Sequence, residues 1–207
     1  MNKLAIYGAG GHGKVIADTA ELLGWQTIHF FDENHSNYSQ HESWEVLGGF
    51  FELCEKLDDY EGVIVAIGNN KIRYAKYSQL KSLGGQLVSL IHPQSIVSRK
   101  AKIGTGSVVF AGAVVNAFTR IGEASIINTS ASIDHDCDLG NAVHICPGTN
   151  LAGNVTVGDF SWIGIGSSVI QQIDITNDVF VGAGSVVVDN IERSGKYFGT
   201  PAKLVED

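Results

Sequence analysis

The sequence predicts an α/β domain over residues 1–90, followed by a triangular parallel β-helix over residues 91–207. Two observations predict this fold class. Stepping by six residues from Ile91 to Val187 meets Ile, Leu or Val at every stop. Such an unbroken period is a physical repeat and not a chance pattern. Before Ile91, short apolar runs alternate with stretches of helical spacing, and glycines separate them.

The first domain follows a β-α-β alternation that is typical of a small Rossmann-like sheet. Glycines mark the expected helix ends at Gly24 and Gly84, and a polar loop follows Glu33. We expect strands at residues 3–7, 27–31, 62–67 and 86–91, and helices at residues 14–23, 50–57 and 71–83.

The period of six predicts three short strands per coil, so the repeating unit is eighteen residues long. Glycine follows the aliphatic residue at every third stop, from Gly104 to Gly158. The position two before each stop is mostly small, and alternate residues of a strand share a side. We therefore expect both positions to point inward and to stack in coils about 4.8 Å apart, with five full coils between Ala101 and Asn190.

A glycine-rich turn, Gly8-x-Gly10-x-x-Gly13, lies between the first predicted strand and the first predicted helix. In this context backbone amides can bind a phosphate at a helix N-terminus. Asp32, at the end of the second strand, is where an acceptor for a ribose hydroxyl would lie. The pattern does not name the nucleotide, and a tight turn that binds nothing is the alternative.

His135 is the candidate with the clearest chemistry, because it lies at an outward corner between Asp134 and Asp136. A carboxylate bound to one imidazole nitrogen raises the basicity of the other, as a general base requires. Gly153 follows eighteen residues later, so its missing side chain leaves a notch beside the ring. His144 precedes Ile145 and also faces outward. For either histidine alone, a solvated surface residue is the alternative.

Other chemistries have weaker support. A zinc site of the kind found in trimeric β-helix carbonic anhydrases needs a third ligand, and His92 lies far along the solenoid axis from His135 and His144. We therefore expect no metal. Cys137 occupies an inward position and Cys146 a turn, which favours a structural role over a nucleophilic one.

Composition excludes several classes of partner. The net charge is −8 and there is no basic cluster, so nucleic acid and anionic membranes are poor candidates. No apolar run approaches the ~20 residues of a membrane span, and the N-terminus enters a strand pattern instead of a signal peptide. Three cysteines without metal-type spacing complete the expectation of a soluble, cytoplasmic protein.

The hexads, closed by Gly199-Thr200-Pro201-Ala202-Lys203, resemble the left-handed β-helix acyltransferases with hexapeptide repeats. The whole chain resembles the PglD/NeuD group of nucleotide-sugar acetyltransferases. The segments that carry this likeness are Tyr7–Gly13, Ala66–Asn70, Asn128–Ser130, Asp134–Cys137 and Ala152–Val155. The left hand of the coil is implied by this resemblance alone.

The resemblance implies a homotrimer, with active sites between subunits, that acetylates the 4-amino group of a UDP-linked, bacillosamine-type dideoxy sugar from acetyl-CoA in bacterial glycan biosynthesis. His135 would be the base and Asp136 would increase its basicity, although family members often have Glu there. Acetyl-CoA would bind at His144, Gly153, Ile165 and Ala183. The nucleotide sugar would bind the first domain at Gly10, Gly11, His12, Asp32, Glu33 and Gly68.

Three rival functions stay open from the sequence. An O-acetyltransferase for sialic acid, as in NeuD, is the nearest. A different class is an NAD(P)-dependent oxidoreductase that uses the Gly8–Gly13 turn and keeps the solenoid as a scaffold. The third is a non-catalytic structural solenoid, which gives no reason for two carboxylates to flank His135.

Overall fold

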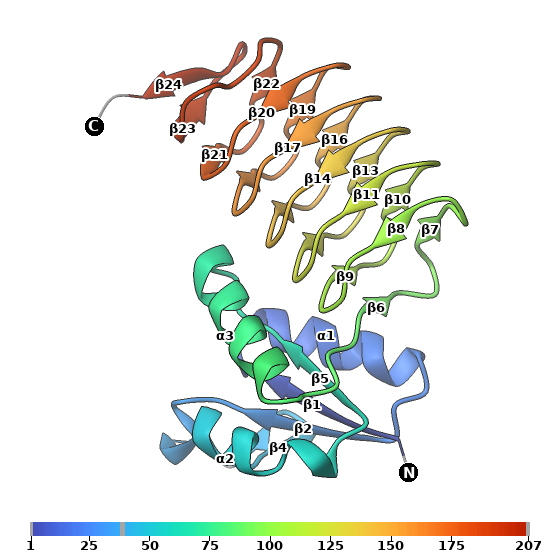
Figure 1. The fold of residues 1–207 in the computed structure, drawn as a ribbon, viewed down its shortest axis with the longest axis vertical. Coiled ribbons are helices and arrows are strands. Elements are labelled where there is room, and N and C mark those ends of the chain that lie inside the picture. Colours follow the sequence, from blue (N-terminus) through green and yellow to red (C-terminus); the bar gives the residue numbers. More distant parts are fainter. Residues whose placement is uncertain (1, 38–39, 206–207) are drawn as a thin grey trace. The chain divides into compact units, whose positions relative to one another are not determined.

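The computed structural model describes residues 2–37 and 40–205. The chain divides into two compact units, Met1–Leu90 and Ile91–Asp207 (Figure 1). Among the described residues, no helix combines the length and the apolar character that crossing a membrane requires.

The first unit is built on a five-stranded sheet with the order β3-β4-β2-β1-β5. Its strands β1, β2, β4 and β5 are parallel, and β3 is antiparallel to β4. The strands are β1 (Lys3–Tyr7), β2 (Thr27–Phe31), β3 (Gln40–His41), β4 (Trp44–Val46) and β5 (Gly62–Val65). The helices are α1 (Gly11–Leu22), α2 (Phe50–Glu55) and α3 (Asn70–Ser82), and short 3₁₀ turns occupy His35–Asn37 and Leu57–Asp59.

The predicted strands at residues 3–7 and 27–31 are confirmed, while other boundaries differ. Helix α1 begins at Gly11 instead of residue 14, so the glycine-rich segment forms its first turn. The strand predicted at residues 86–91 is wrong. Leu87 makes a single bridge to Val63, whereas Leu90–Ile91 forms β6 in a sheet of the solenoid. Strands β3 and β4 were missed because their pairing with β2 depends on distant residues and not on local pattern.

The second unit is a solenoid with three parallel faces, and the predicted fold class is confirmed (Figure 1). The first face contains β7 (Ile96–Val97), β10 (Val114–Val115), β13 (Ser132–Ile133), β16 (Asn150–Leu151), β19 (Ser168–Val169) and β22 (Val186–Val187). The second contains β8 (Lys102–Ile103), β11 (Arg120–Ile121), β14 (Asp138–Leu139), β17 (Thr156–Val157) and β20 (Asp174–Ile175). The third begins with β6 (Leu90–Ile91) and β9 (Val108–Val109), followed by β12 (Ile126–Ile127), β15 (His144–Ile145), β18 (Trp162–Ile163) and β21 (Val179–Val181).

Strand pairing joins residues that are eighteen apart, as the sequence predicts. Val115 pairs with Ile133, and Ile133 pairs with Leu151. The aliphatic residues form one buried cluster, in which Ile133 and Ile145 are 0% exposed. The small inward residues are buried as well, among them Ser107, Thr119 and Ser161. Alternate burial along each strand therefore produces a continuous apolar core.

The backbone conformation at the corners of the solenoid also repeats every six residues. Every sixth residue from Gly106 to Gly184 has a positive φ. Glycine occupies some of these positions, and others hold residues for which the left-handed region is uncommon, such as Asp136 with φ 58° and Phe118 with φ 65°. The conformation turns the chain sharply enough to start the next face after a short connection.

The C-terminal segment covers the last coil. Strand β23 (Gly195–Phe198) pairs in parallel with β21, and β24 (Lys203–Val205) pairs antiparallel with β23. The Gly199–Lys203 segment is joined to the last coil by the Ala202 amide, which donates to the Val186 carbonyl at 2.8 Å. The tail thus caps an open edge of the third face.

We expect Ile175→Ala to lower the free energy of unfolding by about 2–5 kcal/mol, because Ile175 is 2% exposed and its deletion leaves a cavity in the stacked core. Thr156→Ala is the control, since Thr156 is exposed on the neighbouring strand of the same face. It should change stability by no more than about 0.5 kcal/mol. Chemical denaturation measures both, and equal losses would contradict the assigned register.

Candidate active site

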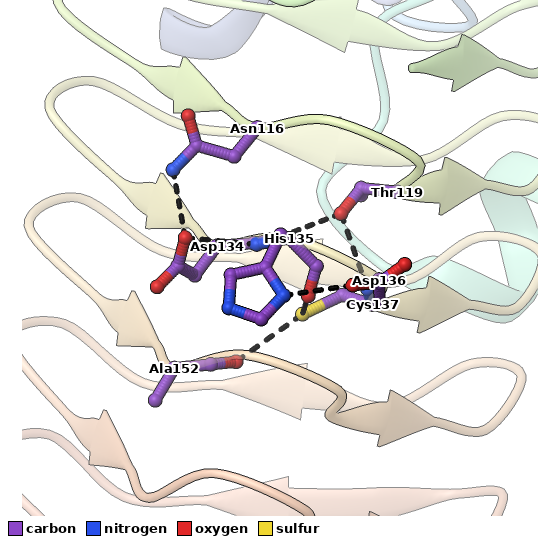
Figure 2. Close-up of polar contacts among 7 residues, drawn as sticks. All are labelled: Asn116, Thr119, Asp134, His135, Asp136, Cys137 and Ala152. Carbon is purple, nitrogen blue, oxygen red and sulfur yellow. Dashed lines mark hydrogen bonds and ion pairs between the residues drawn. The ribbon is translucent and has the colours of Figure 1, made fainter. Parts of the chain in front are cut away.

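The corner between β13 and β14 brings His135 and Asp136 together (Figure 2). The Nδ1 of His135 donates to Asp136 Oδ2 at 2.8 Å. This bond fixes the tautomer and leaves Nε2 with its lone pair. The two side chains are 59% and 54% exposed, so the base faces outward from the core. A neutral imidazole held in this way can accept a proton at Nε2.

Asp134 holds the other side of the same corner. Its Oδ1 accepts a hydrogen bond from the His135 backbone amide at 2.8 Å and another from Asn116 Nδ2 at 2.9 Å. These two bonds lower the pKa of Asp134, which keeps its carboxylate charged. The corner therefore presents one imidazole between two acidic side chains.

The pKa of His135 is raised above its ordinary value. The main cause is the hydrogen bond to Asp136, and the negative charge of Asp134 adds to it. Both carboxylates stabilise the imidazolium more than the neutral ring. His135 is therefore a stronger base than an isolated histidine, and it reaches its neutral form only at a correspondingly higher pH.

Gly153 lies against the His135 ring, as the eighteen-residue spacing predicts. A Cβ at Gly153 would stand 2.6 Å from Cε1 and 2.7 Å from Nε2 of His135. Any larger residue would therefore displace the imidazole. Beside this corner, a groove of about 480 Å³ runs over the first face, lined by Asn116, Ser132, Asp134, Asn150, Ala152 and Gln171, among others.

His144 is on the third face, and its environment differs from the expectation of an exposed side chain. It is 6% exposed because Trp162, its partner on the next strand, covers it with a ring-to-ring distance of 4.1 Å. Asn128 Nδ2 donates to His144 Nε2 at 3.0 Å. The side chain points away from the core, as predicted, but it is covered and held in one orientation.

A single chain does not bring all the predicted acetyl-CoA residues together. The whole second face, represented by β14, separates the corner of His135 from β15, which carries His144. Ile165 is 59% exposed at the corner between the third and first faces, and Ala183 occupies the equivalent corner one coil further on. Gly153 instead lies with His135. The predicted residues therefore form two groups on different sides of the solenoid.

In the first unit, the glycine-rich turn combines two close contacts with two open positions. A Cβ at Gly8 would stand 2.7 Å from the Ala66 carbonyl oxygen, and one at Gly13 would stand 2.3 Å from that of Gly8. Gly10 and Gly11 have no such neighbours within 4 Å. Gly10 is the N-cap of α1 and has no side chain to cap it, so the first-turn amides face an open surface that suits a phosphate.

The two acidic residues after β2 are already engaged. Asp32 accepts from the Ala9 amide at 2.8 Å with Oδ2, and from the Asn34 amide at 2.9 Å with Oδ1. Glu33 accepts from the Tyr7 hydroxyl at 2.7 Å. Asp32 thus fixes the start of the glycine-rich turn.

Gly68 and His12 lie near a buried cation that sequence reasoning missed. Arg73 is 1% exposed and donates to the Ile67 and Gly68 carbonyls at 3.0 and 3.1 Å. It also donates to Asn70 Oδ1 at 2.8 Å. Burial, with a contribution from the charge of Arg73, lowers the pKa of His12 to about 4. His12 is therefore neutral at physiological pH.

The two cysteines of the solenoid and His92 lie in structural contacts. Burial raises the pKa of both Cys137 and Cys146, the latter to about 12, so neither thiol is activated as a nucleophile. His92 Nδ1 accepts a hydrogen bond from the Gln94 amide and stabilises a turn. Across residues 2–37 and 40–205 no group of three His, Cys, Asp or Glu side chains is placed to hold a metal ion.

Asn116, Thr119 and Asn128 were also missed, although the repeat offered a signal. Asn116 lies eighteen residues before Asp134, and Thr119 lies eighteen before Cys137. Asn128 lies sixteen residues before His144. For Arg73 the sequence offered only a basic residue on a predicted helix.

The three-faced parallel solenoid and the histidine corner are typical of the hexapeptide-repeat acyltransferases. Comparison with known proteins narrows this class. Residues 3–80 match the family model of the PglD N-terminal domain. The acetyltransferase domain of PglB from Neisseria gonorrhoeae, solved with acetyl coenzyme A, is 41% identical with a TM-score of 0.95, over 99% of this chain and 100% of that one.

Two further relatives agree. The structure of PerB from Caulobacter crescentus in complex with CoA and GDP-perosamine is 36% identical with a TM-score of 0.94, over 100% of this chain and 98% of that one. The UDP-N-acetylbacillosamine N-acetyltransferase of Bacillus subtilis is 35% identical over 114 residues, which are 54% of this chain and 52% of that protein. The match thus spans about half the length of this curated relative. The chain belongs to the PglD family of nucleotide-sugar acetyltransferases.

We expect Asp136→Asn to lower the pKa of His135, because a neutral amide replaces the carboxylate that accepts the Nδ1 hydrogen bond and stabilises the imidazolium. Asn tolerates the left-handed conformation of position 136, so the corner should keep its backbone. Titration of the imidazole followed by NMR measures the pKa. Asp138→Asn is the control, since Asp138 pairs with Arg120 and not with His135. An unchanged pKa in Asp136→Asn would contradict the assigned hydrogen bond.

Proposed function

We propose that this chain is an acetyl-CoA-dependent N-acetyltransferase, and that its acceptor is the 4-amino group of a nucleotide-linked 4-amino-4,6-dideoxy sugar in bacterial glycan biosynthesis. The single observation that carries the proposal is the His135–Asp136 pair, whose Nε2 faces the Gly153 notch. The PglB structure with acetyl coenzyme A and the PerB structure with CoA and GDP-perosamine support both substrate classes.

His135 acts as the general base. The amine nitrogen attacks the thioester carbonyl carbon, and one N–H proton moves to His135 Nε2 as the new C–N bond forms. Asp136 holds the ring by its Nδ1 and stabilises the imidazolium that results. The tetrahedral intermediate then collapses, the C–S bond breaks, and the departing CoA sulfur receives a proton. These steps use no metal ion.

Acetyl-CoA binds along the two groups of residues that the solenoid presents. The thioester lies beside His135, whose ring packs on Gly153 because that residue has no Cβ. His144 is oriented by Asn128 through its Nε2 and by Trp162 through ring contact, so it forms a fixed part of the acetyl-CoA site. Ile165 and Ala183 form an outward edge for the pantetheine arm one coil apart.

The nucleotide sugar binds the first unit. The uncapped amides of α1 at Gly10 and Gly11 face the diphosphate, with neutral His12 beside them. Asp32, Glu33 and Gly68 lie around the nucleoside. We assign UDP as the nucleotide, with GDP as the competing choice because PerB is solved with GDP-perosamine.

The enzyme works as a homotrimer in the cytoplasm, with each active site shared by two subunits. The second face lies between His135 and His144 within one chain, so one thioester cannot meet both from the same solenoid. A neighbouring copy placed beside the His135 corner can present its His144, Ile165 and Ala183. The outward corners that carry these residues are buried only when a second solenoid packs beside the first. Three-fold cyclic symmetry then repeats this contact at each pair of subunits.

We expect His135→Ala to reduce turnover by about 10²–10⁴-fold, the usual contribution of a general base. The variant should keep the thermal midpoint and the assembly of the wild type, because His135 is exposed. Steady-state kinetics with acetyl-CoA and a UDP-linked 4-amino sugar measure the effect. Wild-type turnover in this variant would refute the assigned base.

The acceptor class is tested in the same assay with a panel of acceptors. Wild-type enzyme is offered UDP- and GDP-linked 4-amino-4,6-dideoxy sugars, free sialic acid and CMP-sialic acid, and acetylated products are identified by mass. Acetylation of an amine supports the proposal. Acetylation of sialic acid alone would replace it by the O-acetyltransferase, and binding of NAD(P)H with no acetyl transfer would favour an oxidoreductase.

Mixed trimers test the shared site. We expect His135→Ala and His144→Ala to be inactive alone and to regain activity when they are co-expressed, because roughly a quarter of the sites then combine an intact His135 from one subunit with an intact His144 from another. Mixing two separately purified trimers without exchange is the control. No recovery in verified mixed trimers would mean that each site is complete within one chain.

A further inference from the structure

The corner that carries His135 is closed from inside the solenoid by a side chain of the preceding coil. Thr119 Oγ1 donates to the Asp134 carbonyl at 2.6 Å and accepts from the Cys137 amide at 3.2 Å (Figure 2). Thr119 is 0% exposed. One buried hydroxyl thus joins the residue before His135 to the residue after Asp136.

Some corners are closed without a side chain, whereas inward serines such as Ser125 make the same bridge at others. The Ala131 amide donates directly to the Asn128 carbonyl at 3.1 Å, and the Thr149 amide donates to the Cys146 carbonyl at 3.2 Å. In the His135 corner the Thr119 hydroxyl lies between the corresponding groups of Asp134 and Cys137. The shape of this corner therefore depends on an atom that belongs to another coil.

The same preceding coil also braces the corner from outside. Asn116 Nδ2 donates to Asp134 Oδ1, which in turn accepts from the His135 amide (Figure 2). Asn116 and Thr119 thus hold the outer and the inner side of one four-residue corner. Between these two braces lie only His135 and Asp136.

The backbone of the corner determines the orientation of His135 and Asp136, because both side chains are exposed and have few other contacts. His135 gains its orientation from Asp136, whose own backbone has a φ of 58° and moves with the corner. Removing the Thr119 hydroxyl would leave a buried carbonyl and a buried amide to find new partners, and the peptides of the corner would rotate to do so. Displacements of about 1 Å in a reacting group can reduce turnover by about 10²-fold.

We propose that Thr119 is a positioning residue for His135, which it holds in register with Asp136 by bridging the Asp134 carbonyl and the Cys137 amide. The kinetic part of this inference rests on the proposed function, whereas its structural part does not. The charged groups that face the ring are Asp134 and Asp136, on its own corner. The neighbouring coils present Asn116, Thr119 and Gly153 to this corner, and the inward Cys137 thiol stays protonated.

The test is a series of three substitutions at Thr119 that keep, weaken or remove the two hydrogen bonds of its side chain. Thr119→Ser keeps the hydroxyl. Thr119→Cys replaces it with a thiol, which the fold already accepts at Cys137, where Sγ donates to the Ala152 carbonyl at 3.2 Å (Figure 2). Thr119→Val keeps the shape and removes the hydrogen bonds. If the valine variant does not fold, the cysteine variant carries the comparison.

Ser161→Ala is the matched control. Ser161 is also 0% exposed, and its Oγ donates to the Thr176 carbonyl at 3.1 Å and accepts from the Val179 amide at 3.2 Å. The bridge is the same, but its corner carries none of the predicted site residues. Thermal denaturation should show comparable losses of stability for Ser161→Ala and Thr119→Val.

The first measurement is the pKa of His135, followed by NMR in labelled protein and assigned with His135→Asn. We expect Thr119→Val to lower this pKa by roughly half a unit or more, because the bond to Asp136 weakens. The His135 pKa of Thr119→Cys should lie between those of Thr119→Val and the wild type. The His135 pKa of Thr119→Ser and of Ser161→Ala should match the wild type. An unchanged His135 pKa throughout the series would overturn the proposal.

The second measurement is turnover with saturating acetyl-CoA and UDP-4-amino sugar. We expect Thr119→Val to lose at least about tenfold in kcat, Thr119→Ser to restore it, and Ser161→Ala to keep it. A loss shared equally by Ser161→Ala would reduce Thr119 to a structural role and refute the proposal. A lowered pKa with unchanged turnover would uphold the positioning of His135 and refute its role as base.

Discussion

Backbone hydrogen bonds between residues eighteen apart determine where each side chain of the solenoid lies. Because Val115, Ile133 and Leu151 are paired in one register, the corner residues between the faces are stacked in register as well. His135 therefore has Asn116 and Thr119 in the coil before it and Gly153 in the coil after it. The same ladder that builds the apolar core thus assembles a polar site, with no loop longer than a corner.

The sequence was sufficient to predict the solenoid and the proximity of His135, Asp136 and Gly153, because both follow the same short period. Ile133 had to be buried, His135 had to face outward, and Gly153 had to lie beside the ring. The burial of His144 under Trp162 also follows the eighteen-residue rule, but periodicity does not reveal how much a neighbour covers. In the first unit, the pairing of β4 with β2 and the burial of Arg73 depend on contacts between distant segments, so local patterns could not predict them.

The charged and polar groups differ between the glycine-rich turn of the first unit and the His135 corner of the second. At the glycine-rich turn, the uncapped N-terminus of α1 and neutral His12 offer donors for an anion without requiring a charged side chain at the surface. At the His135 corner, two carboxylates surround one base and raise its pKa. The first group of donors suits an anion and the second arrangement suits a proton acceptor, although the whole chain carries a net charge of −8.

Cys137 follows the His135–Asp136 pair directly, yet its sulfur points inward and donates to the Ala152 carbonyl. Burial raises the pKa of this thiol, so it contains little thiolate. A thiolate at this position would be a competing acyl acceptor, able to take the acetyl group by thioester exchange. If His135 acts as the proposed base, the inward position of Cys137 keeps its thiol from competing for the acetyl group.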